Sequence, residues 1–285
     1  MRWGPERRLE FIESRLFWEG TINRAHLMEA FGISAQQASS DFARYLEMAP
    51  ENTAYDRSRK GYIAAEEFRP VVTQPDAARY LAQLRLVGDG VITTDDSDLP
   101  LPEFDVVPGP TRKIGAAILR AVLAAVRGGL AVEIFYQSMS APEPAWRRIA
   151  PHALAFDGFR WHVRAYCAKD RAFKDFVLAR IKEAGAASPS PADPSSDHGW
   201  HQRVRVIIGP HSGLSEGQRK AIEADYAMTG GVSVIDVRRC FLYYFLKRFG
   251  LDTAGSTQRR PQDQHVVLLN HEDVLAALVE EQDQA

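Results

Sequence analysis

The chain has 285 residues, enough for two or three domains, and its 45% hydrophobic and 25% charged content is typical of a globular protein in water. No apolar run approaches the roughly 18 residues of a membrane span, and a net charge of −2 excludes a polycation that holds nucleic acid by charge alone. The two cysteines lie in apolar segments, so we expect core thiols, a reducing cytoplasm and no membrane partner.

The N-terminal part has the pattern of a helix-turn-helix. Apolar residues recur at helical spacing over residues 5–18, so we expect this segment to be an amphipathic helix and not the apolar core of a signal peptide. Asn23 is predicted to cap a second short helix that ends at Gly32, and Ser34 to cap a third helix over residues 35–47. Two helices joined by a tight turn with a glycine are typical of DNA-binding heads.

The outward face of the third helix is polar and almost uncharged, which suits a helix that enters the major groove. Its candidate DNA-binding residues are Ser34, Gln36, Gln37, Ser39, Ser40 and Arg44. Residues 53–56 and 61–65 predict a β-wing, whose tip of Arg57, Arg59 and Lys60 reaches phosphates or the minor groove. A three-helix packing domain stays open as the alternative, because residues 1–70 carry ten Lys and Arg against eleven Asp and Glu.

A connector of mixed composition follows the head. Residues 76–87 have the apolar spacing of a helix, whereas residues 93–110 are rich in Asp and Pro and predict an irregular segment. A further helix is expected from its cap at Thr111 to about Arg127, where a Gly-Gly pair ends it. We expect this helix to pack on the sheet that follows.

Four strands are predicted next, at residues 130–138, 146–156, 160–167 and 172–181. An Asp-Gly turn joins the second strand to the third. Short antiparallel strands with tight turns favour a small curled barrel, because closure removes exposed strand edges. Residues 146–182 carry nine Lys and Arg against three Asp and Glu, a net charge of +6, so this sheet is suited to an anionic ligand.

Four motifs follow one another along these strands. They are Phe135-Tyr136-x-Ser138, Arg148-Ile149-x-Pro151-x-x-Leu154, Trp161-His162-Val163-x-Ala165-Tyr166 and Phe176-x-Leu178-x-Arg180-Ile181. Together they resemble the WYL domain of bacterial transcription regulators, with Trp161-His162-Val163 in place of the namesake Trp-Tyr-Leu. The resemblance implies an Sm-like, SH3-type barrel whose basic groove binds a nucleotide or a nucleic-acid ligand.

By this resemblance the ligand groove is formed by Tyr136, Ser138, His152, Arg164 and Arg180. Guanidinium groups stay protonated and can bind a phosphate through two parallel hydrogen bonds, while tyrosine or histidine can stack on a base. Other roles stay open: Tyr136 can fill the core, where Trp161 is also expected, and His152 can be a satisfied strand histidine. Acids on neighbouring strands with which the two arginines can pair are Asp157, Asp170 and Asp175.

The last third of the chain predicts a small α+β sandwich behind a flexible linker. Residues 184–199 are rich in Ala, Ser and Pro, which is typical of a linker. The expected strands lie at 204–208, 232–237 and 265–269, and the expected helices at 215–226, 238–249 and 272–280.

Five short motifs mark this C-terminal part: Gly213-Leu214-Ser215, Asp225-Tyr226-Ala227-Met228, Arg238-Arg239, Tyr243-Tyr244 and Leu251-Asp252. They resemble the C-terminal extension of WYL repressors of the BrxR/CapW type, which are associated with bacterial anti-phage defence loci. The resemblance implies that this part contributes to a homodimer. The aromatic face formed by Phe241, Tyr244, Phe245 and Phe249 fits either a dimer interface or one internal core.

Motifs of the common catalytic and metal sites are absent from the sequence. No Gly-x-x-x-x-Gly-Lys, Cys-x-x-Cys or His-Glu-x-x-His occurs. His198 and His201 have the spacing of metal ligands but no cysteine partner, and Ser212 lacks the elbow of a hydrolase nucleophile. We therefore expect no catalytic residue, no metal, no cofactor and no enzyme.

These observations predict an α+β protein of several domains. The expected parts are a winged helix-turn-helix at 1–70, a helical connector at 71–128, a WYL barrel at 129–184, a linker at 185–199 and a WCX-like dimerisation domain at 200–285.

The leading functional hypothesis is a homodimeric repressor of a phage-defence operon. It would bind an inverted-repeat duplex operator and respond to a nucleotide or nucleic-acid ligand. Replacement of Arg164 or Arg180 by alanine is then expected to abolish induction and to leave operator binding intact. The alternative is an accessory module that grips single strands without regulating transcription.

Overall fold

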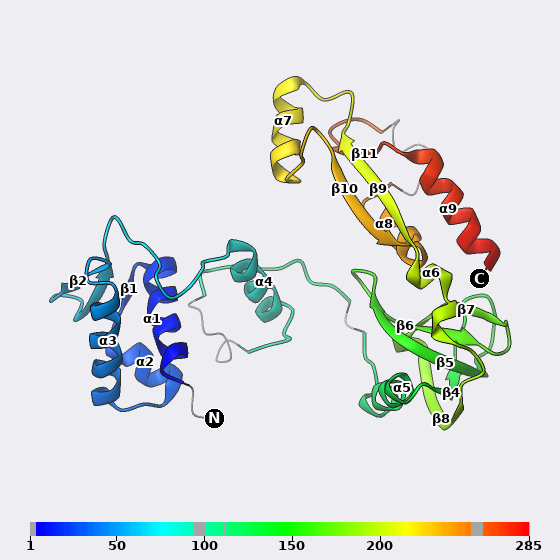
Figure 1. The fold of residues 1–285 in the computed structure, drawn as a ribbon, viewed down its shortest axis with the longest axis horizontal. Helices are drawn as coiled ribbons and strands as arrows, with labels where there is room; N and C mark the ends of the chain where they lie inside the picture. Colours follow the sequence, from blue (N-terminus) through cyan, green and yellow to red (C-terminus); the bar gives the residue numbers. More distant parts are fainter. Residues whose placement is uncertain (1–3, 94–100, 111, 252–258, 285) are drawn as a thin grey trace. The chain divides into compact units, whose positions relative to one another are not determined.

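The computed structural model describes residues 4–93, 101–110, 112–251 and 259–284, and the chain divides into two compact units (Figure 1). The first unit spans Met1–Pro110 and the second spans Thr111–Ala285. Separate hydrophobic cores stabilise the N-terminal head, the five-stranded sheet and the C-terminal part. Across the described ranges, no helix is both long and apolar enough to cross a membrane.

The first unit begins with a winged helix-turn-helix. Its elements are α1 (Pro5–Glu19), β1 (Thr21–Ile22), α2 (Arg24–Phe31), α3 (Ala35–Met48), β2 (Thr53–Asp56) and β3 (Gly61–Ala64). The strands form an antiparallel sheet in the order β1-β3-β2. The three predicted helices and both strands of the wing are confirmed to within a residue, and the two-residue β1 is an addition.

Two of these helices begin at side-chain caps and α2 ends at a left-handed glycine, at the positions that the sequence predicted. The Asn23 side chain accepts a hydrogen bond from the N–H of His26, and Ser34 Oγ accepts one from the N–H of Gln37, each at 3.2 Å. Gly32 ends α2 with φ at 60°, a conformation that favours glycine. The turn between α2 and α3 is therefore set by local chemistry.

A fully buried carboxylate, that of Glu13 on α1, holds the chain that leaves the wing. Its oxygens accept hydrogen bonds from the N–H groups of Val71, Val72 and Thr73 at 2.7, 2.8 and 2.5 Å. They also accept the hydroxyls of Thr73 and Tyr45 at 2.9 and 3.2 Å. A buried carboxylate is tolerated only when donors surround it, so this cluster sets the position of the connector's first residues on the head.

The connector helix α4 (Ala77–Gly88) lies where the sequence predicted. Asp76 caps it by accepting hydrogen bonds from the next N–H groups, and Trp18 of α1 stacks on Tyr80 with ring centroids 4.6 Å apart. Residues 101–110 are irregular as expected, whereas residues 94–100 lie outside the described ranges.

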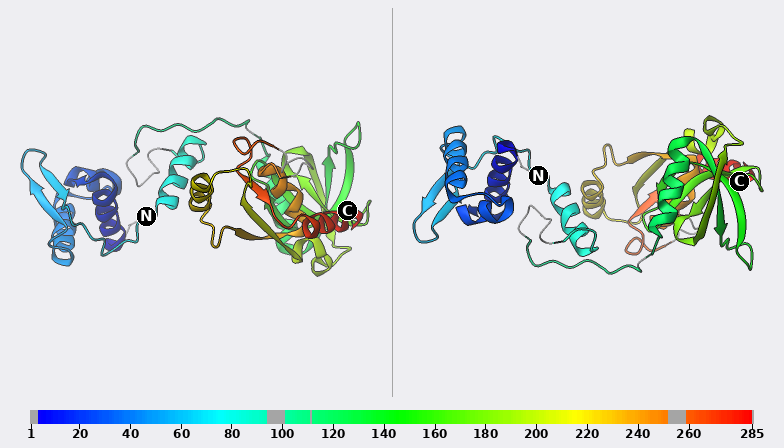
Figure 2. Two further views of the ribbon diagram at one scale, coloured as in Figure 1. Left: turned by 90° about the horizontal axis from the view of Figure 1, so that it is seen from above. Right: turned by 90° about the horizontal axis from the view of Figure 1, so that it is seen from below.

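The second unit begins with α5 (Ala116–Gly128), which packs along one face of a five-stranded antiparallel sheet (Figure 2). The strands are β4 (Leu130–Tyr136), β5 (Ala145–Phe156), β6 (Trp161–Cys167), β7 (Ala172–Val177) and β8 (Ile181–Pro189), in the order β7-β6-β5-β4-β8. Their shared core contains Val122 of α5 with Ile134 and Ile149 of the sheet. The expected packing of this helix is confirmed, and Cys167 is a buried thiol as predicted.

The expected closure into a barrel is not confirmed. Among the described strands no pairing joins β7 to β8, so the curled sheet stays open. A 3-10 turn, η2 (Leu178–Arg180), redirects the chain so that the next strand pairs with β4 on the far edge.

The prediction of a flexible linker at residues 184–199 is wrong. β8 continues to Pro189, and the short helices η3 (Pro194–Ser196) and α6 (His198–His201) follow it. Gly, Ala and Pro are depleted in strands, so the composition of this segment did not reveal its pairing with β4. Thr111 lies outside the described residues, and α5 starts after Gly115 instead.

The C-terminal part of the second unit is the predicted α+β arrangement. Its elements are β9 (Arg203–Pro210), α7 (Glu216–Asp225), β10 (Ser233–Arg238), α8 (Leu242–Arg248), β11 (Val266–Leu268) and α9 (His271–Gln284), with sheet order β10-β9-β11. A 3-10 turn, η4 (Arg239–Phe241), replaces the start of the predicted helix at 238–249.

The aromatic face of α8 packs inside the second unit. Phe241, Phe245 and Phe249 pack against the C-terminal core, and the Tyr244 ring lies 5.0 Å from that of His162 on β6. These side chains therefore pack within the second unit, and their part in a dimer interface stays a prediction.

Replacing Glu13 tests how far the head depends on its buried carboxylate. Glu13→Gln puts an amide NH₂ among N–H donors, so we expect the free energy of unfolding of the head to fall by about 2 kcal/mol, because hydrogen bonds to charged acceptors contribute roughly 1.5–3 kcal/mol. Native-state hydrogen exchange of α1 and α3 amides measures this loss. Glu10→Gln on the same helix is the control, with an expected change below about 0.5 kcal/mol. Equal losses in both variants would contradict this role of Glu13.

Candidate functional site

The first candidate surface is the outward face of α3. Gln36, Ser40 and Arg44 are exposed, and none of them has a side-chain partner within the part of the chain that the structure describes. An amide, a hydroxyl and a guanidinium on one helix can donate and accept hydrogen bonds at base edges and phosphates. These three predicted residues are therefore free for a ligand.

The other predicted residues of α3 have roles inside the head. Ser34 caps the helix, and Ser39 accepts a hydrogen bond from Arg24 of α2 at 3.2 Å. Gln37 is exposed but donates to Asp41 at 3.2 Å. These contacts orient the helix and its surface before any DNA is bound.

A buried ion pair holds α3 against α1. Arg8 donates from Nε to Asp41 Oδ2 at 2.6 Å and from Nη2 to Asp41 Oδ1 at 3.1 Å. Such a two-pronged contact sets orientation as well as distance. The outward face of α3 is thus presented on a rigid support.

The wing tip is organised by Asp56. Its Oδ1 accepts hydrogen bonds from the N–H and hydroxyl of Ser58 at 2.8 and 2.6 Å and from the N–H of Arg59 at 3.2 Å. The hydroxyl bond from Ser58, followed by the backbone bonds, lowers the pKa of Asp56. Arg57, Arg59 and Lys60 are all exposed, as a phosphate-binding tip requires.

Three of the five predicted ligand residues lie apart from the other two. Tyr136 is 6% exposed, its hydroxyl accepts a hydrogen bond from the N–H of Val177 at 3.2 Å, and it belongs to the sheet's core. Ser138 Oγ lies 2.8 Å from Ser140 Oγ. Arg180 is half-buried at the end of η2, and within the described residues its guanidinium has no partner.

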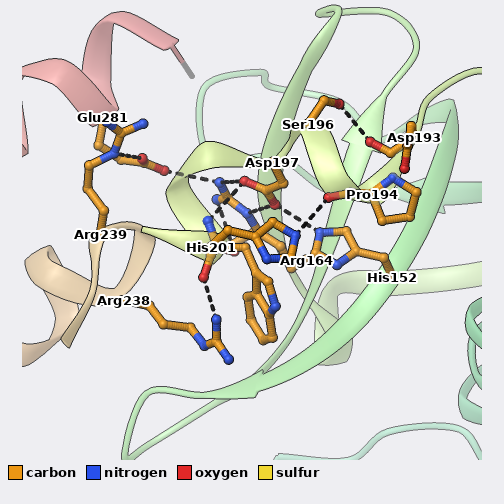
Figure 3. Close-up of polar contacts among 12 residues, drawn as sticks. His152, Arg164, Asp193, Pro194, Ser196, Asp197, His201, Arg238, Arg239 and Glu281 are labelled. Carbon is orange, nitrogen blue, oxygen red and sulfur yellow. Dashed lines mark hydrogen bonds and ion pairs between the residues drawn. The ribbon is translucent and has the colours of Figure 1, made fainter. Parts of the chain in front are cut away.

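Arg164, in the middle of β6, is 4% exposed and surrounded by acids (Figure 3). It donates from Nε and Nη2 to the two oxygens of Asp197, each at 2.8 Å. Nη2 also donates to Glu281 at 3.1 Å, and Nη1 donates to Asp175 at 3.4 Å. The ion pairing left open by the sequence is therefore present with Asp175, together with two acids that the sequence analysis did not name.

Asp197 joins Arg164 to His152. Its Oδ2 lies 2.8 Å from His152 Nε2, and its Oδ1 accepts a hydrogen bond from the N–H of Trp200 at 3.1 Å. Burial alone would raise the pKa of Asp197, but the bonds from Arg164 and His152 hold it well below its usual range. His152 is thus a satisfied strand histidine that positions Asp197.

A cavity of about 330 Å³ opens beside Arg164, at the lower end of the size range of small-molecule sites. Its lining consists of Arg164, Tyr166, Arg171, Ala172, Phe173, Ser196, Asp197, His198, Gly199 and Glu281. Arg171 and His198 are exposed, and within the described residues their side chains have no partner. Tyr166 and Phe173 form an aromatic wall with ring centroids 5.4 Å apart. Guanidinium groups and aromatic rings in one hollow can bind an anion that carries a ring.

Of the residues that line this cavity, the sequence analysis named only Arg164 as a ligand contact. Strand alternation could have indicated Tyr166, because residues two apart on a strand share a face. No local signal could have indicated Asp197 or Glu281, which lie 33 and 117 positions from Arg164 along the chain.

His162, which stands where the namesake motif has tyrosine, makes a contact inside the domain. His162 is buried, and its Nε2 lies 2.9 Å from Asp157 Oδ2 in the β5–β6 hairpin. Burial alone would raise the pKa of Asp157, but hydrogen bonds from His162 and from the N–H groups of Phe159 and Arg160 lower it to about 2. The expected burial of Trp161 is wrong, because this first residue of β6 is 48% exposed at the hairpin.

The histidines with metal-like spacing have other surroundings. His201 Nε2 lies 3.1 Å from the carbonyl oxygen of Pro194, while His198 lines the cavity. Within the described ranges, no group of three or more His, Cys, Asp or Glu residues is arranged to hold a metal ion.

Three family profiles match the chain in succession. Residues 4–86 match the BrxR transcriptional regulator winged helix-turn-helix domain, residues 117–185 match the WYL domain, and residues 203–274 match the BrxR transcriptional regulator C-terminal dimerization domain. The first range covers the head and most of α4, the second covers α5 and the sheet as far as the start of β8, and the third covers the C-terminal part as far as the first turn of α9.

Full-length relatives agree with these profiles. The DNA-binding transcriptional repressor CapW of Stenotrophomonas maltophilia is 39% identical over 285 residues, covering 99% of this chain and 95% of its own length. The CapW repressors of Pseudomonas aeruginosa and Escherichia coli strain KTE188 are 39% and 37% identical, covering 91% and 93% of their own lengths and 96% and 97% of this chain. Proteasome accessory factor B/C of Arthrobacter aurescens matches 96% of this chain and 46% of its own length, at 17% identity and a TM-score of 0.29, too low to support an argument.

Replacement of Arg164 is expected to affect folding before it affects any ligand. Arg164→Ala leaves Asp175, Asp197 and Glu281 without their shared cation, so we expect the free energy of unfolding to fall by about 3–5 kcal/mol. Arg180→Ala, which breaks no ion pair in the described structure, is the control, with an expected loss below about 1 kcal/mol. Urea unfolding measures both. Similar losses in the two variants would show that the acids do not depend on Arg164.

The pKa of Asp157 gives a prediction for acid stability. Because its folded pKa of about 2 lies below the ordinary value of 3.8, its contribution is present above pH 3.8 and is lost as the pH falls towards 2. The shift corresponds to about 2 kcal/mol. We expect Asp157→Asn to be less stable than the parent at pH 7 and to lose less stability between pH 4 and pH 2. Parallel pH profiles of the urea midpoint would contradict this assignment.

Proposed function

The chain belongs to the BrxR/CapW family of WYL-domain transcriptional repressors, and from that premise we propose that it represses transcription by binding a duplex DNA operator as a homodimer. The observation that carries the proposal is the winged helix-turn-helix, with a free polar face on α3 and three exposed cations on its wing. The family consists of DNA-binding repressors and not of enzymes, which confirms the expectation that this chain is not an enzyme.

In the proposed complex, α3 enters the major groove. Gln36, Ser40 and Arg44 contact base edges or phosphates, while Gln37 and Ser39 exchange their internal bonds for contacts to DNA. Ser34 caps α3, so it lies at a helix N-terminus beside a DNA phosphate, and helix N-termini favour anions. Arg57, Arg59 and Lys60 bind phosphates or reach the minor groove.

The operator is proposed to be an inverted repeat. Residues 203–274 match a C-terminal dimerization domain, and two copies related by two-fold symmetry place their recognition helices in successive major grooves. Half-sites one helical turn apart, or a multiple of it, suit that arrangement. Because a repressor acts on the chromosome, we place the protein in the cytoplasm, and we propose a phage-defence operon as its target.

The cavity beside Arg164 is the proposed ligand site. Its cations and its aromatic wall suit a phosphate-bearing nucleotide or the end of a nucleic-acid strand. Arg171 supplies positive charge at the open side, the His198 ring lies beside it in the lining, and His152 acts through Asp197. Tyr136 supports the sheet from its core, whereas Ser138 and Arg180 lie outside this cavity.

Charge removal at the wing tests the DNA half of the proposal. Arg57→Ala and Lys60→Ala are each expected to weaken binding to operator and to random duplex alike, and to reduce the slope of log affinity against log salt by about 1. Lys220→Ala, on α7 of the second unit, removes one charge as a control and is expected to leave the slope unchanged. Fluorescence anisotropy at several salt concentrations measures the slopes. An unchanged slope in both wing variants would exclude the wing as a phosphate contact.

Sequence choice separates the repressor from a strand-gripping accessory module. A repressor is expected to prefer an inverted repeat upstream of its own operon over random duplex by roughly 10³-fold or more. Gln36→Ala is expected to reduce that preference more than it reduces non-specific affinity. Tighter binding to single strands than to any duplex, without sequence choice, would overturn the proposal.

A further inference from the structure

The guanidinium of Arg164 is almost saturated by acids of its own chain. Of its five N–H groups, the one on Nε and the two on Nη2 are directed at Asp197 and Glu281, and one on Nη1 is directed at Asp175. An anion that enters the cavity cannot bind this arginine fully unless one carboxylate leaves. The identity of that carboxylate decides what ligand binding does to the protein.

The three acids differ in how firmly they are held. Asp197 has two bonds from Arg164 and further contacts with His152 and Trp200, and its side chain is 1% exposed. Asp175 lies on β7, directly opposite Arg164 in the sheet, and its side chain is 9% exposed. Glu281 receives one bond from Arg164, lines the cavity and is the most exposed of the three, at 16%.

Glu281 also has a second cation available. Arg239 of η4 donates from Nε to Glu281 Oε2 at 3.1 Å and from Nη1 to Glu280 Oε2 at 3.2 Å. Figure 3 shows the Glu281 carboxylate between Arg239 and Arg164. Loss of the Arg164 contact therefore does not strand Glu281 as an unpaired buried charge, which lowers the cost of its departure.

The close approach of these groups depends on Gly199 of α6. A Cβ atom at this position would lie 2.5 Å from Glu281 Oε2 and 2.7 Å from Arg164 Nη2. Because Gly199 has no side chain, Arg164 of β6 and Glu281 of α9 can both lie close to the backbone of α6. The contact therefore depends on three elements, β6, α6 and α9.

We propose that Glu281 is an internal occupant of the anion site, and that a phosphate group competes with its carboxylate for Arg164. Binding of the phosphate then detaches the end of α9 from the sheet. This inference rests on the ligand site proposed above and adds its mode of regulation: the C-terminal helix reports whether the site is filled. The phosphate and the Glu281 carboxylate exclude each other. Any interaction that stabilises the Glu281–Arg164 contact therefore weakens phosphate binding, and by the same factor phosphate weakens that interaction.

The extent of the release is limited by packing. Val274, in the first turn of α9, is fully buried in the C-terminal core, and Ala277 and Leu278 also pack against that core, whereas Glu281 lies two turns after Val274. The base of the helix stays in place while its end is freed. Hydrogen exchange in the last turns of α9 is therefore the direct readout.

Titration with inorganic phosphate at constant ionic strength tests the competition in the full-length protein. The Arg164 Nε–H resonance reports binding, and hydrogen exchange of residues 280–284 reports release. Glu281→Gln removes the competing charge, so we expect phosphate to bind about tenfold more tightly, which corresponds to about 1.4 kcal/mol. In the parent protein, phosphate is expected to speed exchange at the end of α9.

Glu280→Gln is the matched control, because it removes the same charge from the neighbouring residue, touches Arg239 and leaves Arg164 alone. Its phosphate affinity is expected to stay within about twofold of that of the parent. This result would distinguish direct competition for Arg164 from a general change in the electrostatic potential at the site. Thermal melting shows that each variant is folded.

Three outcomes would overturn the inference. If Glu281→Gln and Glu280→Gln bind phosphate equally, or if phosphate leaves the exchange of α9 unchanged, the site stands and the internal competition fails. If phosphate shifts no Arg164 resonance in any folded variant, the ligand site fails as well and the inference falls with it. Operator binding by the head is measured separately and is independent of all three.

Discussion

The second unit depends on a guanidinium buried among carboxylates. Arg164 lies on β6, Asp197 at the start of α6 and Glu281 near the end of α9, so a single side chain joins the sheet, the segment after it and the last helix. Removing a charge from water is costly, and only partners with good geometry offset that cost. The two-pronged bond to Asp197 supplies such geometry, and it orders a segment whose composition is typical of a flexible linker.

The head uses the same device on a smaller scale. Glu13 is surrounded by N–H and hydroxyl donors, and Arg8 makes a two-pronged pair with Asp41. The Glu13 carboxylate positions the backbone after the wing, and the Arg8–Asp41 pair positions α3 against α1. The exposed face of α3 carries neutral polar groups and one arginine. Charges within the head therefore set geometry, and the residues available to DNA are those that carry few internal bonds.

The arrangement around Arg164 also bears on how a regulator of this kind can respond to a ligand. A ligand shifts an equilibrium only by the difference in its affinity for two states. A cation that is already satisfied by an acid of another element provides such a difference, because the anion and the acid cannot both be bound. In the proposed competition, the bound state would differ from the free state in the contact of Glu281 on α9 with Arg164.

Local sequence patterns were sufficient for most of the elements and for the order of the domains. Helical spacing, caps at Asn23 and Ser34 and the glycine after α2 act over a few residues, so α1 to α3 and the wing could be predicted closely. The motifs of the strands were sufficient for the family resemblance. The exposed residues of α3 could be named because helix periodicity separates an inner from an outer face.

Tertiary structure alone decided which charged residues are free and which are bound. Residues 184–199 have a linker's composition, yet β8 pairs with β4 and Asp197 is drawn to Arg164. Tyr136 and His152 carry the chemistry of ligand contacts, but burial and long-range partners give them structural roles. Periodicity and capping depend on neighbours a few residues away, and the sequence determined these. The pairing of a buried charge depends on segments 33 and 117 residues distant, which only the folded chain brings together.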